Sequence, residues 1–414
     1  MLHPMIDHLS RVDGARVLAD LHALRAIGAY KTGVHKPTFS EPHIRSLQWL
    51  VQRLPEAGLA GEIDGIGNVL GTSTKPGPNL LAGSHLESQN RAGWLDGPLG
   101  VVYALEAARV INRDPNTSGA VEVASWCDEE GHFGHFLGSR SYVGGVSEAD
   151  IDAARDRNSG KTMRDALRDA GLAGRARARC ERGRHIGYLE AHIEQGETLE
   201  SSALKIGIVT SIVGIWQYRI SFTGEQNHAG TTRMAVRKDA GLALARFCVA
   251  IDERFPAACG PRTVWTTGRI TLEPGAPSII PGAAEMLFQI RDDDPAVIAR
   301  LEDLLRSMAT EVDKQGRCTA AVERIRTGAP ALMDFSFQQA IEQASAACAG
   351  GRSLRMPSGA GHDAQILATV MPAGMLFVPS IGGVSHHWTE NTADADIVTG
   401  AEVFVEACRR LLAR

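Results

Sequence analysis

Asn79-Leu80-Leu81-Ala82-Gly83-Ser84 is an almost wholly apolar run that ends in small residues, as a buried strand does. The segment from Pro98 to Ile111 follows it, and its apolar side chains recur on one helical face, which predicts a helix. A second apolar run, Ala120 to Trp126, predicts the next strand. Strand, helix and strand in this order indicate an α/β sheet. Ligands bind beyond the carboxyl ends of the strands in such sheets, so the residues after each run are site candidates.

Metal-type ligands stand at these strand ends and at two later places in the chain. His85 directly follows the first run, and Asp96 lies in a glycine-rich turn beyond it. Three histidines, together with carboxylates that can bridge, are what two divalent ions held close together require. The remaining candidates are Glu129 and Glu130 in Cys127-Asp128-Glu129-Glu130-Gly131, His192 in His192-Ile193-Glu194-Gln195-Gly196, and His386 in Gly383-Val384-Ser385-His386-His387.

The residue types predict different roles for the carboxylates. Asp96 is short and lies in a turn, which makes it the best candidate for a bridge between two ions. Glu129 and Glu130 are adjacent and would point in different directions, so one can bind metal while the other handles protons. A metal-dependent hydrolase needs both, because the metals acidify a water and a base accepts its proton.

Each of these residues alone has an ordinary explanation. A single histidine is more often a surface or hydrogen-bonded residue than a ligand, and a Glu-Glu pair is usually the solvated start of a helix. We expect His132 and His135, close to Glu130, to be loop residues. Only the joint pattern outweighs these alternatives.

The middle of the chain has a different pattern from its flanks. Strands are predicted over 215–223, 264–272, 283–290 and 318–325, and helices over 236–251 and 296–313. This βαββαβ order is the ferredoxin-like pattern. Past Pro330 the α/β pattern resumes, with a strand over 375–378 and a helix over 397–412. We therefore expect an α/β domain in two parts, 1–212 and 329–414, interrupted by an inserted α+β domain at 213–328, with hinges near 212 and 329.

The bulk properties exclude several classes of protein. A chain of 414 residues is too long for one hydrophobic core, which agrees with two domains. The net charge is −5, and neither a basic block nor an apolar run of about 20 residues occurs, so we expect no nucleic-acid or membrane partner. The first 16 residues have no apolar region of a signal peptide. Seven scattered cysteines without a CxxC pair indicate free thiols and a cytoplasmic protein. Glycine spacing excludes a dinucleotide or P-loop site.

The chain resembles the M20 metallopeptidase superfamily, in its amidase/carbamoylase branch. The resemblance runs from Gly83 to Asn391. Simple peptidases of the superfamily usually have a carboxylate where His192 stands, so this block favours the amidase branch. Besides the ligand blocks above, the matching residues are Gly138-Ser139-Arg140, Asn227-His228-Ala229-Gly230-Thr231-Thr232, Pro274-Gly275-Ala276, Ser358-Gly359-Ala360-Gly361-His362-Asp363-Ala364, and Glu390 after Ser385-His386.

The resemblance implies an M20-type catalytic domain, a mixed sheet flanked by helices, with the inserted ferredoxin-like domain as a lid and dimerisation domain. It also implies two divalent metal ions per subunit. One ion would be held by His85, Asp96 and His192, and the other by Asp96, Glu130 and His386, with Asp96 bridging. Glu129 would be the general base and then the acid, and His387 a neighbour rather than a ligand. Zinc, manganese, cobalt or nickel would suit these ligands.

The resemblance further implies substrate-binding residues in the insert. Arg291 matches an arginine that grips the substrate carboxylate, for which a guanidinium fork is suited. His228 matches a lid histidine that polarises the scissile carbonyl in the neighbouring subunit's site, so a homodimer is implied. The other residues expected at the pocket are Gln195, Asn227, Ser278, Gly361 and His362.

Four residues depart from the family pattern. Glu87 stands where an Asp usually orients the first histidine, and we expect it to keep that hydrogen bond while shifting the ring. Ser278 stands where Asn is frequent, which shortens a contact with substrate. Arg233 and Trp388 each stand where Pro is common. The metal residues therefore match the family, whereas the residues around the substrate do not follow its standard pattern.

The sequence therefore predicts a dinuclear metal amidohydrolase that cleaves a linear amide or ureido bond of a small carboxylate, with an N-carbamoyl-L-amino acid as the first candidate. Alternatives within enzymes are an allantoate or ureidoglycolate amidohydrolase, or an aminoacylase or dipeptidase acting on an unusual amide. An alternative of another class is a non-catalytic, metal-stabilised binding protein.

Overall fold

The computed structural model describes residues 11–115, 117 and 119–413 and divides the chain into two compact units. Unit 1 contains the described residues up to Thr210, Leu332–Ser358, and the chain from His362 onward. Unit 2 contains Ser211–Ala331 and Gly359–Gly361. The N-terminal segment for which no signal peptide is expected lies, up to residue 10, outside the described residues. No helix among the described residues is long and apolar enough to cross a membrane.

Unit 1 is built on a nine-stranded mixed sheet. The central strands β17, β7, β5 and β6 are parallel neighbours, and β8, β4 and β3 pair antiparallel at the two sides. In sheet order the strands are β15 (Ala331–Leu332), β8 (Ile206–Ile212), β17 (Ala373–Val378), β7 (His185–Ile193), β5 (Asn79–His85), β6 (Val121–Trp126), β4 (Val69–Thr72) and β3 (Ala60–Ile63), with β16 (Ser353–Ser358) beside β8.

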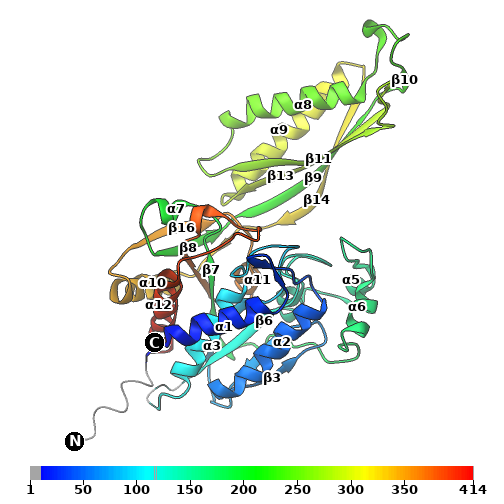
Figure 1. Cartoon of the computed structure of the whole chain (residues 1–414). Coiled ribbons are helices and arrows are strands. Elements are labelled where there is room, and N and C mark those ends of the chain that lie inside the picture. Colours follow the sequence, from blue (N-terminus) through cyan, green and yellow to red (C-terminus); the bar gives the residue numbers. More distant parts are fainter. Residues whose placement is uncertain (1–10, 116, 118, 414) are drawn as a thin grey trace, which may run out of the picture. The chain divides into compact units, whose positions relative to one another are not determined.

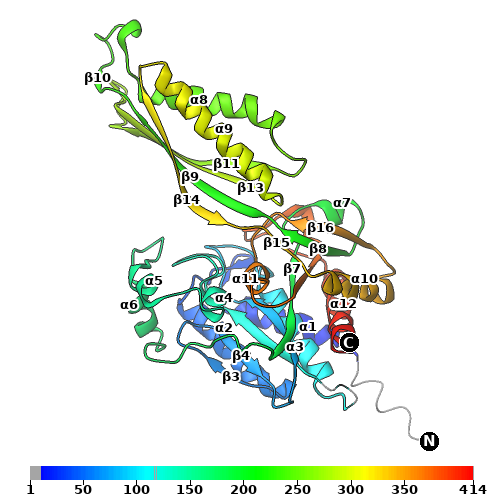
Figure 2. The ribbon, with the colours of Figure 1, turned by 180° about the vertical axis from the view of Figure 1, so that it is seen from behind.

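Helices cover this sheet, which confirms the predicted α/β fold class. α3 packs on β5, β6 and β7, and α12 packs on α3 and β17. Figure 2 shows α10 beside α12, as Figure 1 does from the other side. The helices of unit 1 are α1 (Gly14–Ala26), α2 (Glu41–Arg53), α3 (Pro98–Ile111), α4 (Leu137–Tyr142), α5 (Glu148–Ala153), α6 (Met163–Asp169), α7 (Thr198–Ser201), α10 (Phe335–Cys348), α11 (Asp363–Leu367) and α12 (Asp394–Leu412). Short elements are β1 (Ala29–Tyr30), β2 (Gly33–Val34), η1 (Leu54–Ala57) and η4 (Ile381–Gly383).

The central strands lie in the core over their full length. Every residue of β5, β6 and β17 is buried, as in strands covered on both faces. Such strands have continuous apolar runs instead of alternation, which is why the sequence predicted them to within one or two residues. The two-sided burial makes the carboxyl ends of β5, β6 and β7 a fixed frame for side chains.

Unit 2 has the predicted βαββαβ order. Its four antiparallel strands lie in the order β11 (Val264–Glu273), β13 (Ala283–Asp292), β9 (Gly214–Thr223) and β14 (Thr319–Gly328). The helices α8 (Ala240–Arg254) and α9 (Pro295–Lys314) cover one face of this sheet (Figure 1). A separate pair, β10 (Asn227–His228) and β12 (Ile279–Ile280), projects beyond one end of the sheet. The short helices η2 (Met234–Val236) and η3 (Phe255–Ala257) flank α8.

The prediction of a helix over 236–251 was wrong at its start. α8 begins only at Ala240, because the Asp239 side chain accepts a hydrogen bond from the Leu242 amide and caps the helix there. Met234–Val236 form a separate single turn before it. The apolar residues before Asp239 continued the helical pattern but are exposed in the structure.

Candidate metal centre

Two parallel strands place the first two histidines at the same edge of the unit 1 sheet. His85 is the last residue of β5, and His192 is the second-to-last residue of β7. β5 and β7 are parallel neighbours, with Gly83 paired to Glu190. Their carboxyl ends therefore meet, and the two imidazole rings lie with their centroids 6.0 Å apart.

A glycine allows Asp96 to approach His85. Gly97 has φ +86°, and a Cβ there would lie 2.5 Å from the His85 ring. Pro98 then begins α3, so the turn that carries Asp96 ends directly at a helix N-terminus. Both the left-handed backbone and the close approach require glycine at this position.

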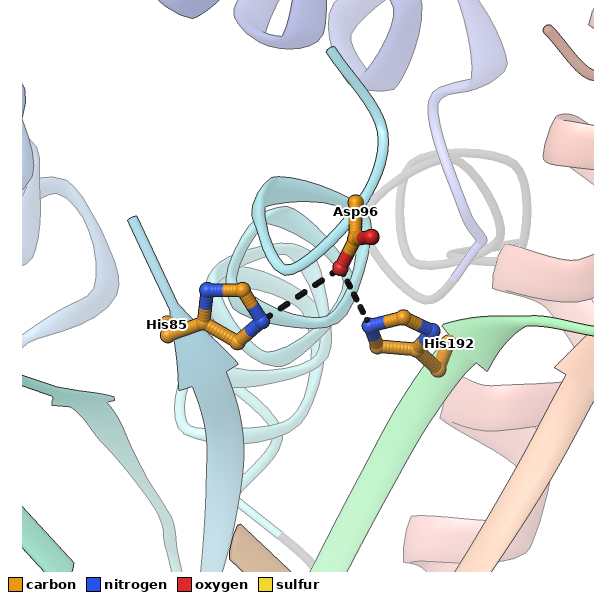
Figure 3. Close-up of side chains that lie close together, drawn as sticks. All are labelled: His85, Asp96 and His192. Atoms are coloured by element: carbon orange, nitrogen blue, oxygen red, sulfur yellow. Dashed lines mark ion pairs between the residues drawn. The ribbon is translucent and has the colours of Figure 1, made fainter. Parts of the chain in front are cut away.

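The two carboxylate oxygens of Asp96 face different histidines. Oδ1 lies 3.5 Å from Nε2 of His85 and 3.0 Å from Nε2 of His192 (Figure 3). Oδ2 lies 3.4 Å from Nε2 of His386, which is also 3.8 Å from Oε2 of Glu130. The ligand atoms of His85, Asp96 and His192, and those of Asp96, Glu130 and His386, form two groups whose members all lie within 4.8 Å of one another. All five predicted metal ligands are thus brought together, with Asp96 shared.

The tautomers of two histidines fit metal ions. Nδ1 of His85 lies 3.2 Å from the backbone oxygen of Glu87, and Nδ1 of His192 lies 3.0 Å from that of Ile193. A carbonyl oxygen only accepts hydrogen bonds, so each Nδ1 carries the hydrogen. In the neutral rings, Nε2 then presents a lone pair to the Asp96 carboxylate, which is also an acceptor. A cation between these atoms resolves the conflict, so the donor set fits a metal.

The electrostatics of the centre also require positive charge. Among the residues that the structure describes, no Lys or Arg forms an ion pair with Asp96, Glu129 or Glu130. Burial alone would lower the pKa of His85, but the carboxylates of Asp96 and Glu129 hold it well above its usual range. Burial raises the pKa of Glu130, and the negative charge of Asp96 raises it further. A cluster of buried carboxylates and histidines without a fixed cation is stabilised by bound cations.

Glu129 lies beside the ligands without belonging to either group. Its Oε2 lies 3.8 Å from Nε2 of His85, and the residue is almost fully buried. Burial raises the pKa of Glu129 well above its usual range, although the His85 charge opposes the rise. A carboxyl group whose pKa is raised holds a proton more firmly than an exposed one, which suits general base and acid catalysis.

Glu130 is held in place by Gln89, a residue that the sequence did not single out. The Gln89 backbone amide donates to Oε1 of Glu130 at 3.1 Å, and its side-chain amide donates to Oε2 at 2.7 Å. Asp128, just before the pair, has a left-handed backbone with φ 60°. Its carboxylate accepts hydrogen bonds from the amides of Phe133 and Gly134, which folds the loop after the ligands. The acidic run at the end of β6 was the only signal for Asp128.

Glu390 and Glu190 are further buried carboxylates around the centre whose roles the sequence did not reveal. Oε1 of Glu390 accepts hydrogen bonds from the backbone amides of Leu95 and Asp96. Glu190 accepts from Ser84 Oγ at 2.8 Å and from the Ala364 amide at 2.9 Å, and so joins β5, β7 and the start of α11. Each carboxylate binds backbone amides of a segment that is distant in the sequence. Sequence spacing alone therefore does not reveal its role.

The expectation for Glu87 needs a correction. Its carboxylate does not make the expected hydrogen bond to the His85 ring: Oε1 lies 3.8 Å from Nδ1, and the ring nitrogen is instead bonded to the Glu87 backbone oxygen. Oε1 accepts a hydrogen bond from the Glu129 amide at 2.6 Å. The extra methylene carries the carboxylate past the ring, which accounts for the difference.

Two predicted pocket residues lie against the metal ligands in unit 1. The Gln195 side-chain amide donates to Oδ2 of Asp96 and to Oγ of Ser385, each at 3.0 Å. His362 is buried, with its ring centroid 4.7 Å from that of His192 and its Nε2 2.9 Å from Ser358 Oγ. Contacts of these two residues with substrate stay predictions.

Three other predicted residues meet on the β10–β12 pair of unit 2. His228 pairs with Ile279, and the Ala229 amide donates to the backbone oxygen of Ser278. The side-chain oxygen of Asn227 accepts from the His228 amide at 2.8 Å. Nδ1 of His228 accepts from the amides of residues 230 and 231 at 3.0 and 3.2 Å. The hydrogen of the neutral ring is therefore on Nε2, which can donate to an acceptor.

Arg291 occupies a different part of unit 2. It lies near the end of β13, and its Nη1 donates to the backbone oxygen of Gly359 at 2.8 Å. Gly361 belongs to the same three-residue segment. Within unit 2, Arg291 is thus grouped with the glycine loop and not with His228.

The predicted neighbours of the ligands have ordinary surroundings. The His387 ring is tilted against the Trp388 ring at a centroid distance of 3.8 Å, and Lys31 Nζ lies 3.7 Å from the centroid of the Trp388 ring. Arg233 is exposed directly before Met234–Val236. His132 and His135 lie in the loop between β6 and α4, where the sequence placed them.

A family model described as Peptidase family M20/M25/M40 matches residues 76–410. The chain belongs to this family. This M20 chain is 32% identical to an N-carbamoyl-L-amino-acid amidohydrolase of Paenarthrobacter aurescens, over 97% of the chain and 99% of that protein. It is 33% identical to an allantoate amidohydrolase of Bacillus subtilis, over 86% and 87%. The crystal structure of a hydantoinase/carbamoylase family amidase from Burkholderia phymatum has a TM-score of 0.88 at 45% identity and covers 98% of each chain.

These similarities confirm the predicted family, its amidase branch and the enzyme class. The M20 chain is an amidohydrolase, a hydrolase of carbon–nitrogen bonds other than peptide bonds. A solved structure described as a dinuclear metal binding peptidase of the M20 family from Bacillus subtilis shares the fold, at 13% identity and a TM-score of 0.63.

Proposed function

We propose that this M20 chain is a two-metal amidohydrolase that cleaves the ureido C–N bond of an N-carbamoyl-L-amino acid. The observation that carries the proposal is that one carboxylate oxygen of Asp96 faces His192 and the other faces His386. The overall reaction consumes one water and yields the free amino acid, CO2 and ammonia. The relative named for this activity is similar over nearly the whole of both chains.

The proposed metal ligands are His85, Asp96 and His192 for one ion, and Asp96, Glu130 and His386 for the other. Two divalent ions, when bound, would acidify a water and stabilise negative charge on the carbonyl oxygen. Zinc, manganese, cobalt and nickel all suit imidazole and carboxylate ligands.

Glu129 is the proposed proton carrier. Oε2 lies next to the ligand cluster, and burial raises the pKa of this carboxyl group, so that it can accept a proton and return it. It takes the proton of the attacking water and delivers it to the nitrogen that leaves the carbonyl carbon. Without this second transfer the leaving amine would depart as an unstable anion.

His228 and Arg291 are the proposed substrate contacts of unit 2. The tautomer of His228 supports this role, because an Nε2–H can donate a hydrogen bond to the carbonyl oxygen that is attacked. Arg291 would grip the substrate carboxylate with its guanidinium fork. Asn227, Ser278, Gly361 and His362 are proposed to line the pocket, as is Gln195.

The positions of these two residues within unit 2 favour a homodimer. Arg291 pairs with Ile215 at the start of β9, whereas His228 follows the end of β9 at Thr223. Eight residue steps along β13, at about 3.3 Å each, separate the two ends of the sheet by roughly 25 Å. A small substrate does not span that distance. If His228 and Arg291 both contact one substrate molecule, they must therefore come from two copies of the chain.

A substrate panel tests the proposed function. The purified protein is loaded with zinc, manganese, cobalt or nickel, and release of ammonia and amine is followed with N-carbamoyl-L-amino acids, their D-enantiomers, and N-acetyl amino acids. We expect both products from the L-carbamoyl compounds only. A protein that binds no metal, or that releases amine from N-acetyl substrates alone, would contradict the proposal.

The second candidate is an allantoate or ureidoglycolate amidohydrolase. It is supported by the similarity to relatives with these names, an allantoate amidohydrolase at 33% identity and a ureidoglycolate hydrolase of Oryza sativa at 30%. Both compounds carry a ureido group beside a carboxylate, so the same centre would serve. Adding them to the panel separates the candidates by their relative kcat/KM.

A further inference from the structure

The Glu87 carboxylate is fully buried beside the metal centre and faces two groups. Oε1 accepts the hydrogen bond from the backbone amide of Glu129, at 2.6 Å. Oε2 lies 3.6 Å from Nε2 of His43, and neither of these two buried atoms has a hydrogen-bond partner in the described structure. Glu87 therefore lies between the proposed base and a histidine of α2 that is in neither group of metal ligands.

The tautomer of His43 fits this arrangement. Its Nδ1 accepts a hydrogen bond from the Phe39 amide at 3.0 Å, so the hydrogen of the neutral ring is on Nε2. Its Nε2–H donor lies 3.6 Å from Oε2 of Glu87, which is an acceptor. His43 is fully buried on α2, a helix of 13 residues, which fixes its position.

The length of the Glu87 side chain determines which group its carboxylate reaches. The His85 ring is already bonded through Nδ1 to the Glu87 backbone oxygen, so it does not need the carboxylate. With the ring satisfied, the side chain extends to the turn after β6. The turn is also held on its other side, where the Asp128 carboxylate accepts from the amides of His132, Phe133 and Gly134.

We propose that Glu87 is a positioning residue for Glu129, and that His43 acts through Glu87 by fixing its carboxylate. The proposal rests on the proposed role of Glu129 as the base. Glu87 accepts the amide hydrogen of Glu129 and so fixes the backbone from which the base side chain extends. Residues that hold the groups around a metal site commonly change activity about 10- to 100-fold when they are replaced.

Glu87→Gln is the first test. Gln keeps the length, but its NH2 group would face either Nε2–H of His43 or the Glu129 amide, which is a contact between donors. We expect kcat to fall about 10- to 100-fold with KM within about twofold and two metal ions still bound per chain. Hydrogen exchange of the peptide around Glu129 should become faster, a readout that needs no substrate. The matched control is Asp64→Asn, which alters another buried carboxylate that holds a turn, through the Ile66 and Asn68 amides.

His43→Phe tests the second half of the proposal. We expect a smaller fall in kcat than for Glu87→Gln, and no further fall when the two changes are combined, because His43 acts only through Glu87. Additive effects would overturn this part. Unchanged kcat and unchanged exchange in Glu87→Gln, or loss of metal from it, would overturn the role of Glu87. Failure of the underlying function is distinguishable, since Glu129→Gln would then retain turnover.

Discussion

Glu390 holds the backbone of Asp96 although 294 residues separate them in the chain: its Oε1 lies 3.1 Å from the Asp96 amide nitrogen. The same oxygen accepts from the Leu95 amide at 3.2 Å. The turn that carries the shared carboxylate is thus fixed from the segment just after His386. Glu87 holds Glu129 in the same manner, so the proposed bridge and the proposed base each depend on another buried carboxylate.

Glu390→Gln should weaken metal binding. Gln can keep one acceptor for the Asp96 amide, but its NH2 group cannot accept the hydroxyl hydrogen that Ser385 Oγ donates to Oε2, at 3.3 Å, in the wild type. We expect metal affinity to fall about 10- to 100-fold, as measured by competition with a chelator. Glu406→Gln, on the outer part of α12, is the control and should retain wild-type affinity. Equal affinities of the Glu390 variant and the wild type would contradict the role given to Glu390.

Glu129→Gln should separate catalysis from metal binding. Glu129 belongs to neither ligand group, so we expect two ions per chain in the variant, as measured by elemental analysis. Removal of the proton carrier should lower kcat by about 10²- to 10⁴-fold. If kcat stays within a few-fold of wild type, another group moves the proton. The comparison with Glu130→Gln is informative, because that variant should lose metal as well as activity.

A mixing experiment tests whether two copies form one site. His228→Ala and Arg291→Ala should each be nearly inactive, because each removes a different contact with the same substrate. If these residues reach one site from two chains, a mixed dimer contains one complete site and one that lacks both residues. Mixing after dissociation should therefore restore about a quarter of wild-type activity at equal ratios. No recovery, although mixed dimers are detected by mass, would contradict the shared site.

Much of the fold was predictable from the sequence because burial leaves a clear pattern in it. β5, β6 and β17 are buried throughout and have continuous apolar runs, and the strands of unit 2 alternate. Short strands such as β3 and β4, four residues each, have no comparable pattern and were not predicted. The start of α8 was missed because a single cap at Asp239 outweighed a continuing apolar pattern.

The candidate site was predictable in its ligand types and not in the residues that hold them. His85 and Glu130 follow strand ends and are recognisable as donors for metal. Gln89, His43 and Glu390 are polar residues whose partners are backbone amides or carboxylates elsewhere in the chain. Sequence spacing does not reveal such pairings, because they depend on how segments pack. The hydrogen bond of the Glu87 carboxylate differs from the predicted one for the same reason, because its partner is the Glu129 amide in the turn after β6.

Lys36 gives a prediction about stability and pH. Its side chain is almost fully buried, with Nζ donating to the backbone oxygen of Leu24 at 2.6 Å. Burial lowers the pKa of Lys36 from 10.5 to about 7. Between these values the unfolded chain binds the proton and the folded chain does not, so the free energy of unfolding rises with pH in this window. Below pH 7 both states bind the proton and the cost of burying the charge is fully present.

Lys36→Met removes this dependence. The difference in unfolding free energy between the variant and the wild type should shrink by about 3 kcal/mol from pH 7 to pH 9.5, since one pKa unit is worth about 1.4 kcal/mol. A constant offset from packing and from the lost hydrogen bond to Leu24 does not affect this trend. Urea unfolding of both proteins across the pH range measures it, with Lys314→Met at the exposed end of α9 as the control. Parallel pH profiles for the Lys36 variant and the wild type would show that Lys36 is charged in the folded protein throughout the range.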